Sequence, residues 1–219
     1  MDTKIQFQKN ANITTTNGQS LGQIDRVVLN PATKVITDIV IRQGTLFNKE
    51  DRVIPIDFVV ETTEENIVLR EDVGELDAFP PFEERRVVAE STDIDRKLSS
   101  GNNPQPVNYG FPEVGPSFVK PPSEQFVTQI EKNIPEGTVA MKEGARVITA
   151  EGKHVGSVER VLADASIDQI THLLISNGTF TKTAKLIPIK WVMVIGEDEV
   201  HLRVKSNSVE ELDATSMAV

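Results

Sequence analysis

The chain lacks cysteine altogether, has three histidines, and draws only 5% of its 219 residues from Phe, Trp and Tyr. Without cysteine it has no disulfide framework, no thiolate zinc site and no thiol nucleophile. No run of 18 apolar residues occurs, and the N-terminal segment MDTKIQFQKN has no charged-then-apolar signal profile. We therefore expect a cytoplasmic protein with no membrane span.

Positive charge is also scarce. The chain has 23 Lys and Arg residues against 33 Asp and Glu residues, which gives a net charge of -10. Nucleic-acid binding depends on clustered Lys and Arg that neutralise phosphates, and an acidic membrane surface repels an acidic protein. The charge therefore argues against both partners and favours a protein partner. The remaining composition, 38% hydrophobic and 26% charged, is typical of a globular chain long enough for two modest domains.

An internal repeat is visible when the sequence is shifted by 134 residues. The shift aligns ANITTTNGQSLGQIDRVV, from Ala11, with ARVITAEGKHVGSVERVL, from Ala145. Eleven of the 36 aligned positions from Ala11 to Leu46 are identical. After a one-residue deletion near Ala184 the shift becomes 133 and aligns RVIPIDFVV with KLIPIKWVM. A shared order of elements over this length indicates a duplicated unit.

Each copy consists of short segments rich in Val, Ile and Thr, separated by Gly, Asn, Asp and Pro, a pattern typical of strands. Asn17-Gly18 predicts a type I′ hairpin turn between two strands, whereas its counterpart Glu151-Gly152 suits positive φ less well. The expected strands span 12–16, 20–29, 35–43, 52–56 and 66–70, with later counterparts near 169–177, 185–189 and 199–204. A short helix is expected at the end of each copy, near Val73–Ala78 and Val209–Ala214.

Five or six short strands in about 70 residues favour a small antiparallel β-barrel, because closure removes exposed sheet edges. The uniformly apolar segments Ile39–Ile41 and Leu173–Ile175 indicate a central strand that is buried on both faces. Pro55 and Pro188 cannot donate to a strand ladder, so they predict a strand end or a bend.

Both copies resemble the PRC-barrel domain, the small barrel found in the photosynthetic reaction centre H subunit and in the ribosome maturation factor. The resemblance rests on GQSLGQIDRVV, VITDIVIRQGTLF and RVIPIDFV in the first copy, and on IPEGTVAMKEGARVITAEGKHVGSVERV, ITHLLISNG, LIPI and VHLRV in the second. It implies an all-β fold of two small PRC-type antiparallel barrels, each closed by a short C-terminal helix. It implies no single activity, because this family hosts unrelated roles on one scaffold.

These observations divide the chain into a first barrel, residues 1–82, a strap, residues 83–137, and a second barrel, residues 138–219. The strap holds eight Gly and Pro residues between positions 103 and 122, which exclude a long helix or an interior strand there. It also carries aromatic residues that a solvated linker would not need, namely Tyr109, Phe111, Phe118 and Phe126. We expect an extended strap that packs on one or both barrels; a proline-rich motif for an external partner is the alternative.

Phe58 and Trp191 occupy matched positions, three residues after Pro55 and Pro188. Their place in both copies predicts packing in the core or between the barrels rather than a shelf for a cofactor. Trp191 is the candidate for the seam between the barrels, because small domains gain stability by covering apolar area that their own cores leave exposed.

No constellation for catalysis, a cofactor or a metal emerges from the sequence. His154, His172 and His201 have no histidine counterparts in the first copy, so no matching ligand set exists. The segment from Asp164 begins like a calcium loop but lacks its glycine and its final glutamate. Nucleophile elbows and phosphate-binding loops are missing as well. We predict that the protein is not an enzyme and has no cofactor.

We therefore expect a non-catalytic protein that binds another macromolecule, through barrel surfaces or the aromatic strap, in protein–protein interaction or assembly. One alternative is an RNA- or ribosome-associated factor, which the maturation factor suggests and the acidity opposes. A second is a peripheral subunit of a membrane complex, which would need a basic amphipathic segment that this chain lacks. Self-association as a homo-oligomer is left open.

Overall fold

The computed structural model describes residues 4–45, 48–63, 65–71, 76–89, 126–177 and 183–215. The predicted all-β class is confirmed, with one short α-helix among these residues. The strands of the first half are β1 (Lys4–Gln8), β2 (Asn12–Thr15), β3 (Ser20–Leu29), β4 (Ile36–Thr45), β5 (Asn48–Pro55), β6 (Val59–Thr62) and β7 (Asn66–Leu69). Those of the second half are β10 (Val139–Lys142), β11 (Arg146–Ile148), β12 (His154–Asp164), β13 (Gln169–Asn177), β14 (Thr183–Pro188), β15 (Val192–Ile195), β16 (Glu199–Leu202) and β17 (Ala214–Thr215).

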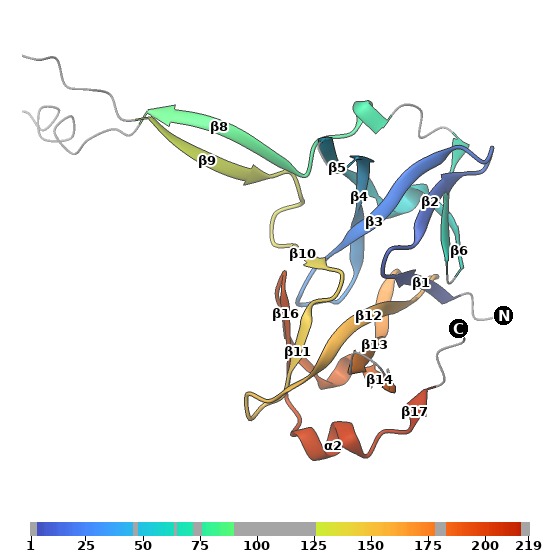
Figure 1. The fold of residues 1–219 in the computed structure, drawn as a ribbon, viewed down its shortest axis with the longest axis vertical. Coiled ribbons are helices and arrows are strands. Elements are labelled where there is room, and N and C mark those ends of the chain that lie inside the picture. Colours follow the sequence, from blue (N-terminus) through green and yellow to red (C-terminus); the bar gives the residue numbers. More distant parts are fainter. Residues whose placement is uncertain are drawn as a thin grey trace, which may run out of the picture. The chain divides into compact units, whose positions relative to one another are not determined.

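Two sheets with the same strand order contain these strands (Figure 1). The first runs β5-β4-β3-β2-β7-β6, and the second runs β14-β13-β12-β11-β16-β15. In both, a single parallel pair, β2 with β7 and β11 with β16, interrupts otherwise antiparallel pairing. The central strands β4 and β13 are flanked on both sides, as their uniformly apolar sequences predict.

The predicted closed barrels are not formed by the described strands, because β5 and β6 lie at opposite ends of the first sheet, as β14 and β15 do in the second. Each sheet bends instead at a proline: Pro55 and Pro188 end a strand and are followed by the 3-10 turns Ile56–Phe58 and Ile189–Trp191. A short segment lies along the outer edge of β5 in the first sheet, and another along the outer edge of β14 in the second, where a closed barrel would have a neighbouring strand. Val53 N–H donates to the carbonyl oxygen of Pro80 at 3.1 Å, and β17 pairs with β14.

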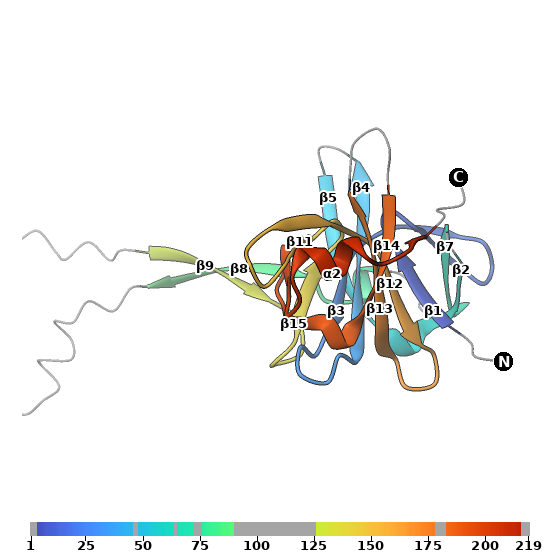
Figure 2. The same ribbon diagram turned by 90° about the horizontal axis from the view of Figure 1, so that it is seen from below.

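The two halves exchange their first strands (Figure 1 and Figure 2). β1, from the beginning of the chain, pairs antiparallel with β12 of the second sheet. β10, which begins the second half, pairs antiparallel with β3 of the first sheet. The registers correspond under the shift of 134 residues, because Gln8 faces Arg160 and Lys142 faces Arg26. Strand pairing therefore crosses the boundaries predicted at residues 82 and 138, and each half completes the sheet of the other.

A reciprocal pair of backbone hydrogen bonds joins the sheets elsewhere. Ile36 N–H donates to the carbonyl oxygen of Asp168 at 2.8 Å, and Ile170 N–H donates to that of Lys34 at 2.9 Å. Lys34 and Asp168 both adopt left-handed backbone conformations, with φ of 63° and 50°. The same local geometry thus recurs at equivalent positions in both halves.

The hairpin turn at Asn17-Gly18 is present, but it is not the predicted type I′. Only Gly18 has positive φ, at 85°, and its N–H donates to the carbonyl oxygen of Thr15 at 2.9 Å. This is a three-residue loop with glycine in the left-handed position, and Gly152, at φ 81°, closes an equivalent loop. Glu151 fits because its own φ is not positive.

The hydrophobic core is continuous through both halves. One cluster joins the inner faces of the two sheets and includes side chains of the exchanged strands, such as Phe7 and Met141. A smaller second cluster lies on the outer face of the first sheet and contains Val28, Val40 and Val53. This part of the outer face of the first sheet is therefore also buried.

The helical predictions are corrected in position. The only α-helix among the described residues, α2 (Ser206–Glu210), begins three residues earlier than predicted. Its start is fixed by the Glu151 carboxylate, which accepts a hydrogen bond from Ser206 N–H at 3.1 Å. In the first half the short 3-10 turn η3 (Leu76–Ala78) stands in the predicted range.

The predicted strap contains strands that the sequence interpretation missed. β8 (Glu83–Ala89) and β9 (Phe126–Lys132) form a two-stranded sheet of their own, within a separate compact unit that spans residues 84–131. Both strands lie outside the Gly- and Pro-rich part of the strap and carry Val or Ile residues that favour extended backbone. The predicted packing of the strap on the barrels stays a prediction.

Candidate interaction surface

The aromatic residues predicted as contacts fall in different places. Phe58 is half-buried against the core, with its ring perpendicular to that of Phe79 at 5.4 Å and the Arg70 guanidinium 4.6 Å above it. Trp191, at the matched position, is also half-buried against the core. Phe126 lies in β9, and its side chain is outside the description. Tyr109, Phe111 and Phe118 lie outside the described residues.

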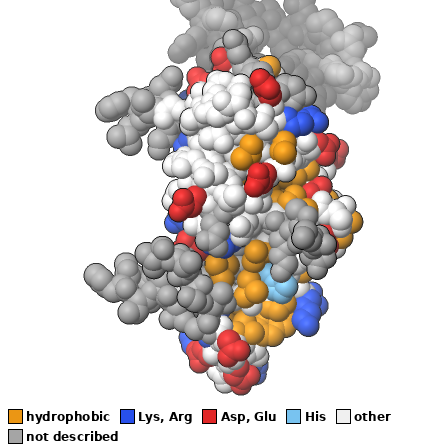
Figure 3. Space-filling view, turned by 90° about the vertical axis from the view of Figure 1, so that its right-hand side faces the viewer, with side chains coloured by type: hydrophobic (Ala, Val, Ile, Leu, Met, Phe, Trp, Pro, Cys, Tyr) orange, Lys and Arg blue, Asp and Glu red, His pale blue; other side chains and the backbone are white. Residues whose placement is uncertain are grey.

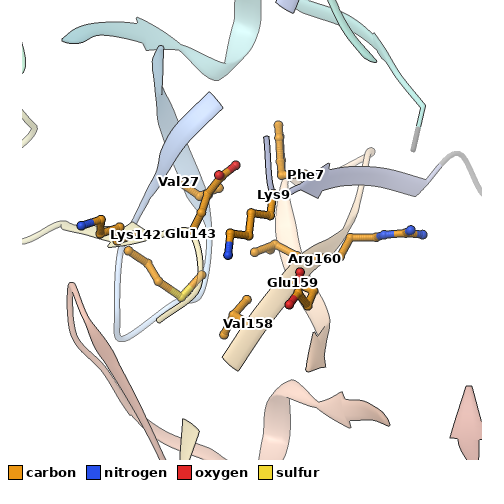
Figure 4. A pocket seen from close by; sticks show the side chains of 10 residues that line it. Phe7, Lys9, Val27, Lys142, Glu143, Val158, Glu159 and Arg160 are labelled. Carbon is orange, nitrogen blue, oxygen red and sulfur yellow. The ribbon is translucent and has the colours of Figure 1, made fainter. Parts of the chain in front are cut away.

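A small cavity lies where the exchanged strands meet (Figure 4). Its apolar walls come from equivalent positions of both halves, because Phe7 faces Val161 in one strand pair and Met141 faces Val27 in the other. Its volume of about 10 Å³ is close to the minimum that one water molecule needs. The cavity is therefore too small for a substrate.

Beside this cavity, the buried carboxylate of Asp25 is held by two arginines. Its oxygens lie 2.6 Å from an Arg42 nitrogen and 3.2 Å from Arg26 Nε. Arg42 also donates two hydrogen bonds to Asp51, at 3.0 and 3.1 Å. Burial raises the pKa of Asp25, and the positive charge of Arg42 opposes that shift. This arrangement holds a buried acid between two positive charges.

Glu143 provides the second carboxylate near the cavity. Its two oxygens accept hydrogen bonds from the backbone N–H of Asn10 at 2.9 and 3.1 Å, across the exchanged strands. Burial raises the pKa of Glu143 to about 7, helped by the charge of Asp25 and opposed by the Asn10 N–H, Lys9 and Arg42. Glu143 therefore changes charge near neutral pH at the junction of the two halves.

The charged groups described do not assemble into a metal centre, since no group of three or more acidic or histidine side chains in the described ranges could hold an ion. The predicted absence of catalysis stays a prediction. His154 is exposed on the first residue of β12, and His201 lies 3.3 Å from Glu199 on β16.

The outer faces of the two sheets are built from equivalent positions. In the first sheet, Val28 faces Asp38 across the strands and Asp38 faces Pro55. In the second, Leu162, His172 and Pro188 follow one another in the same register. The adjacent rows also correspond: Arg26, Val40 and Val53 in the first sheet, and Arg160, Leu174 and Leu186 in the second.

An aromatic residue covers the outer face of the first sheet. Phe82 is 1% exposed and packs with Val28, Val40 and Val53. The Arg26 guanidinium lies 4.9 Å from the centre of its ring, a cation–π contact. The backbone holds Phe82 in place, because its N–H donates to the Asp51 carbonyl oxygen at 2.7 Å and its own carbonyl accepts from Asn133 N–H at 3.0 Å.

The equivalent face of the second sheet has no such cover among the described residues. Leu162 and Leu186 are half-buried, whereas their counterparts Val28 and Val53 are 0% and 3% exposed; Leu174, on the strand between them, is buried at 5%. Thr215 of β17 stands at the register position of Phe82, opposite Ala184. Figure 3 shows hydrophobic side chains gathered around a histidine in the lower part of the molecule, which belongs to the second half. We call this outer face of the second sheet, made of Leu162, His172, Leu174, Leu186 and Pro188, the open face.

Arg160 borders the open face, as Arg26 borders the covered one. Its guanidinium donates to the side-chain oxygens of Gln6 at 3.3 Å and Gln8 at 2.6 Å, both on β1. The exchanged strand therefore positions the arginine beside Leu162 and Leu174.

The fold defines an all-β protein with two similarly ordered sheets and an apolar surface on one of them. Residues 9–79 match the model of the PRC-barrel domain family, and residues 141–210 match that of a family described as an uncharacterized protein conserved in bacteria, DUF2171. No curated protein matches the chain. Strand β1 and half of β10 lie outside the matched segments. Within the described ranges, the helix is far too short to cross a membrane, and no other helix could do so.

The sequence did not predict the open face, because the contact residues predicted from it were aromatic and none of the five residues that define this face is Phe, Trp or Tyr. A signal existed, since the aligned copies place Leu162 and Leu186 opposite Val28 and Val53, and His172 opposite Asp38. The aligned positions alone could not show that Phe82 covers only one of the two faces.

Proposed function

We propose that this protein is a non-catalytic protein-binding module that contacts its partner through the open face. The observation that carries the proposal is the difference between two equivalent faces, of which Phe82 covers one and no described residue covers the other in the same way. Half-buried leucines beside a polar histidine and an arginine form a surface with an apolar centre and a polar rim, as protein interfaces do.

We further propose that the two halves are copies of one PRC-type unit. Support comes from the matched strand orders, the equivalent registers of β1 on β12 and β10 on β3, and the match of the first half to the PRC-barrel model. On this view the exchange of strands makes a rigid scaffold, and the functional surface lies outside its core.

Affinity capture from the native host tests the binding role by comparing three baits. The first is the unchanged protein, and the second carries Leu186→Gln, which places a polar group on the β14 side of the open face. The third, Met193→Gln, is the matched control, because Met193 is 56% exposed on β15 of the same sheet. We expect the Leu186 variant alone to lose its specific partner, with all three baits showing equal thermal stability. Identical capture by all three baits would refute this use of the open face.

A further inference from the structure

We infer that the open face binds an extended peptide that carries a phenylalanine or another aromatic residue, with the ring seated against the half-buried Leu162 and Leu186, above the buried Leu174 and beside Arg160. This inference rests on the proposed function and specifies the chemistry of the partner. The covered face supplies the template, because there the chain itself provides such a segment, Pro80–Phe82.

The ring on the covered face shows which contacts an occupant makes. Phe82 packs against Val28, Val40 and Val53, which come from two adjacent rows of the same face, with Ile134 at the periphery. The open face has leucines at the three equivalent positions, Leu162, Leu174 and Leu186, in the same register. A leucine side chain has more apolar area than a valine side chain. The three leucines of the open face therefore provide at least as much apolar surface for a ring as the three valines beneath Phe82.

The arginine gives the aromatic preference. Arg26 lies 4.9 Å from the Phe82 ring centre, and Arg160 holds the equivalent place in the second sheet. Gln6 and Gln8 bind the Arg160 guanidinium from the β1 side, which fixes its position at the border of the open face. A fixed guanidinium favours an aromatic ring over an aliphatic side chain of similar size.

The extended shape of the occupant follows from the segment on the covered face. Pro80 and Pro81 precede Phe82, and the segment makes strand-like bonds along the edge of β5: Val53 N–H donates to the Pro80 oxygen, and Phe82 N–H to the Asp51 oxygen. A segment of this kind loses little conformational entropy on binding, because prolines restrict it beforehand. On the second sheet β17 already occupies the edge of β14, so the peptide can repeat the contacts of the Phe82 ring but not the edge bonds of Pro80–Phe82.

The test is a titration of the intact protein with a peptide of sequence AFPPFEER, residues 78–85 of this chain, followed by amide chemical shifts. We expect shifts at Leu162, His172 and Leu186, and none when the second phenylalanine of the peptide is replaced by alanine. Arg160→Gln should weaken binding about two- to fivefold. The matched variant Arg26→Gln should leave the affinity unchanged.

Three results would overturn the inference. One is the absence of shifts, and another is shifts confined to Val28 and Val53, which would mean that the peptide merely replaces Phe82. The third is a concentration-dependent dimer that buries the open face without peptide, since a second copy would then be its occupant. If the peptide fails while Leu186→Gln still loses its captured partner, the aromatic peptide is the wrong ligand class and the binding role stands. If both experiments fail, the proposed function falls as well.

Discussion

Phe7 and Met141 occupy equivalent register positions on the two exchanged strands, and both side chains are buried at the wall of one cavity. Phe7 lies opposite Val161 and is 3% exposed, and Met141 lies opposite Val27 and is 2% exposed. Each belongs by sequence to one half and by strand pairing to the other, so the two halves share one core.

Truncation of either residue should therefore destabilise the whole molecule. We expect Phe7→Ala to cost about 3 to 5 kcal/mol and Met141→Ala about 2 to 5 kcal/mol in the free energy of unfolding. Denaturant unfolding measures both, with Val60→Ala as a control, because Val60 is 57% exposed. A cost below about 1 kcal/mol for Phe7 would contradict its place in the shared core.

Two equivalent glycines, one in β3 and one in β12, should resist replacement. A Cβ on Gly22 would overlap the Arg42 carbonyl oxygen, and one on Gly156 would lie 2.5 Å from that of Ser176, with φ of 135° and 147°. We expect Gly22→Ala and Gly156→Ala each to cost about 3 kcal/mol or more. Gly18→Ala is the control, because the space around Gly18 is open. Only the positive φ of that position should destabilise the alanine variant, by about 1 kcal/mol. Equal melting temperatures for all three variants would disprove the close strand contact.

The stability of the protein should fall as pH rises through the range in which Glu143 titrates. The pKa of Glu143 is about 7 in the folded protein, because burial raises it from the ordinary value of 4.5. Between these values the folded state binds more protons than the unfolded chain, so rising pH favours unfolding. The ionisation of Glu143 should therefore lower the free energy of unfolding by on the order of 2 kcal/mol between pH 4.5 and pH 8. This figure allows for the partial exposure of Glu143 to solvent.

Glu143→Gln isolates that contribution, because the amide oxygen can still accept the Asn10 N–H. Unfolding measured at several pH values should show a shallower decline for the variant. Asp25 and Asp38, whose pKa values burial also raises, contribute equally to both proteins. Parallel curves for the two proteins would show that Glu143 stays ionised at the junction.

Removal of Phe82 should uncover the first outer face and create a second peptide site. We expect Phe82→Ala to cost about 3 to 5 kcal/mol in stability. While it remains folded, this variant should bind two equivalents of the AFPPFEER peptide where the unchanged protein binds one, as calorimetry would show. An unchanged ratio of one would mean that the two outer faces are not equivalent binding surfaces.

Much of the strand layout was accessible from the sequence. β-branched segments between turn residues predicted β3, β4, β5 and β7, and the two prolines marked the ends of β5 and β14, since a residue without N–H ends a ladder. The turn type was harder to predict, because it depends on the φ of a single residue. At Asn17-Gly18 only the glycine has positive φ, so a three-residue loop replaces the predicted two-residue turn.

Strand exchange and the open face depend on contacts between distant residues. The five residues of β1 carry the alternation of an ordinary strand, and nothing in that pattern chooses β12 over β3 as the partner. The cover by Phe82 likewise depends on backbone bonds to Asp51 and Asn133, which lie 31 and 51 residues away along the chain. Local propensity contains no information about such pairings.

The most direct test of the account is to cut the chain between its halves. A site for a specific protease placed within residues 90–125 allows cleavage of the intact, folded protein, followed by size-exclusion chromatography and thermal unfolding in native buffer. Because β1 and β10 each complete the other half's sheet, we predict that the cut protein elutes as one species and unfolds in one transition. Two fragments that separate without denaturant and unfold independently would contradict the exchange.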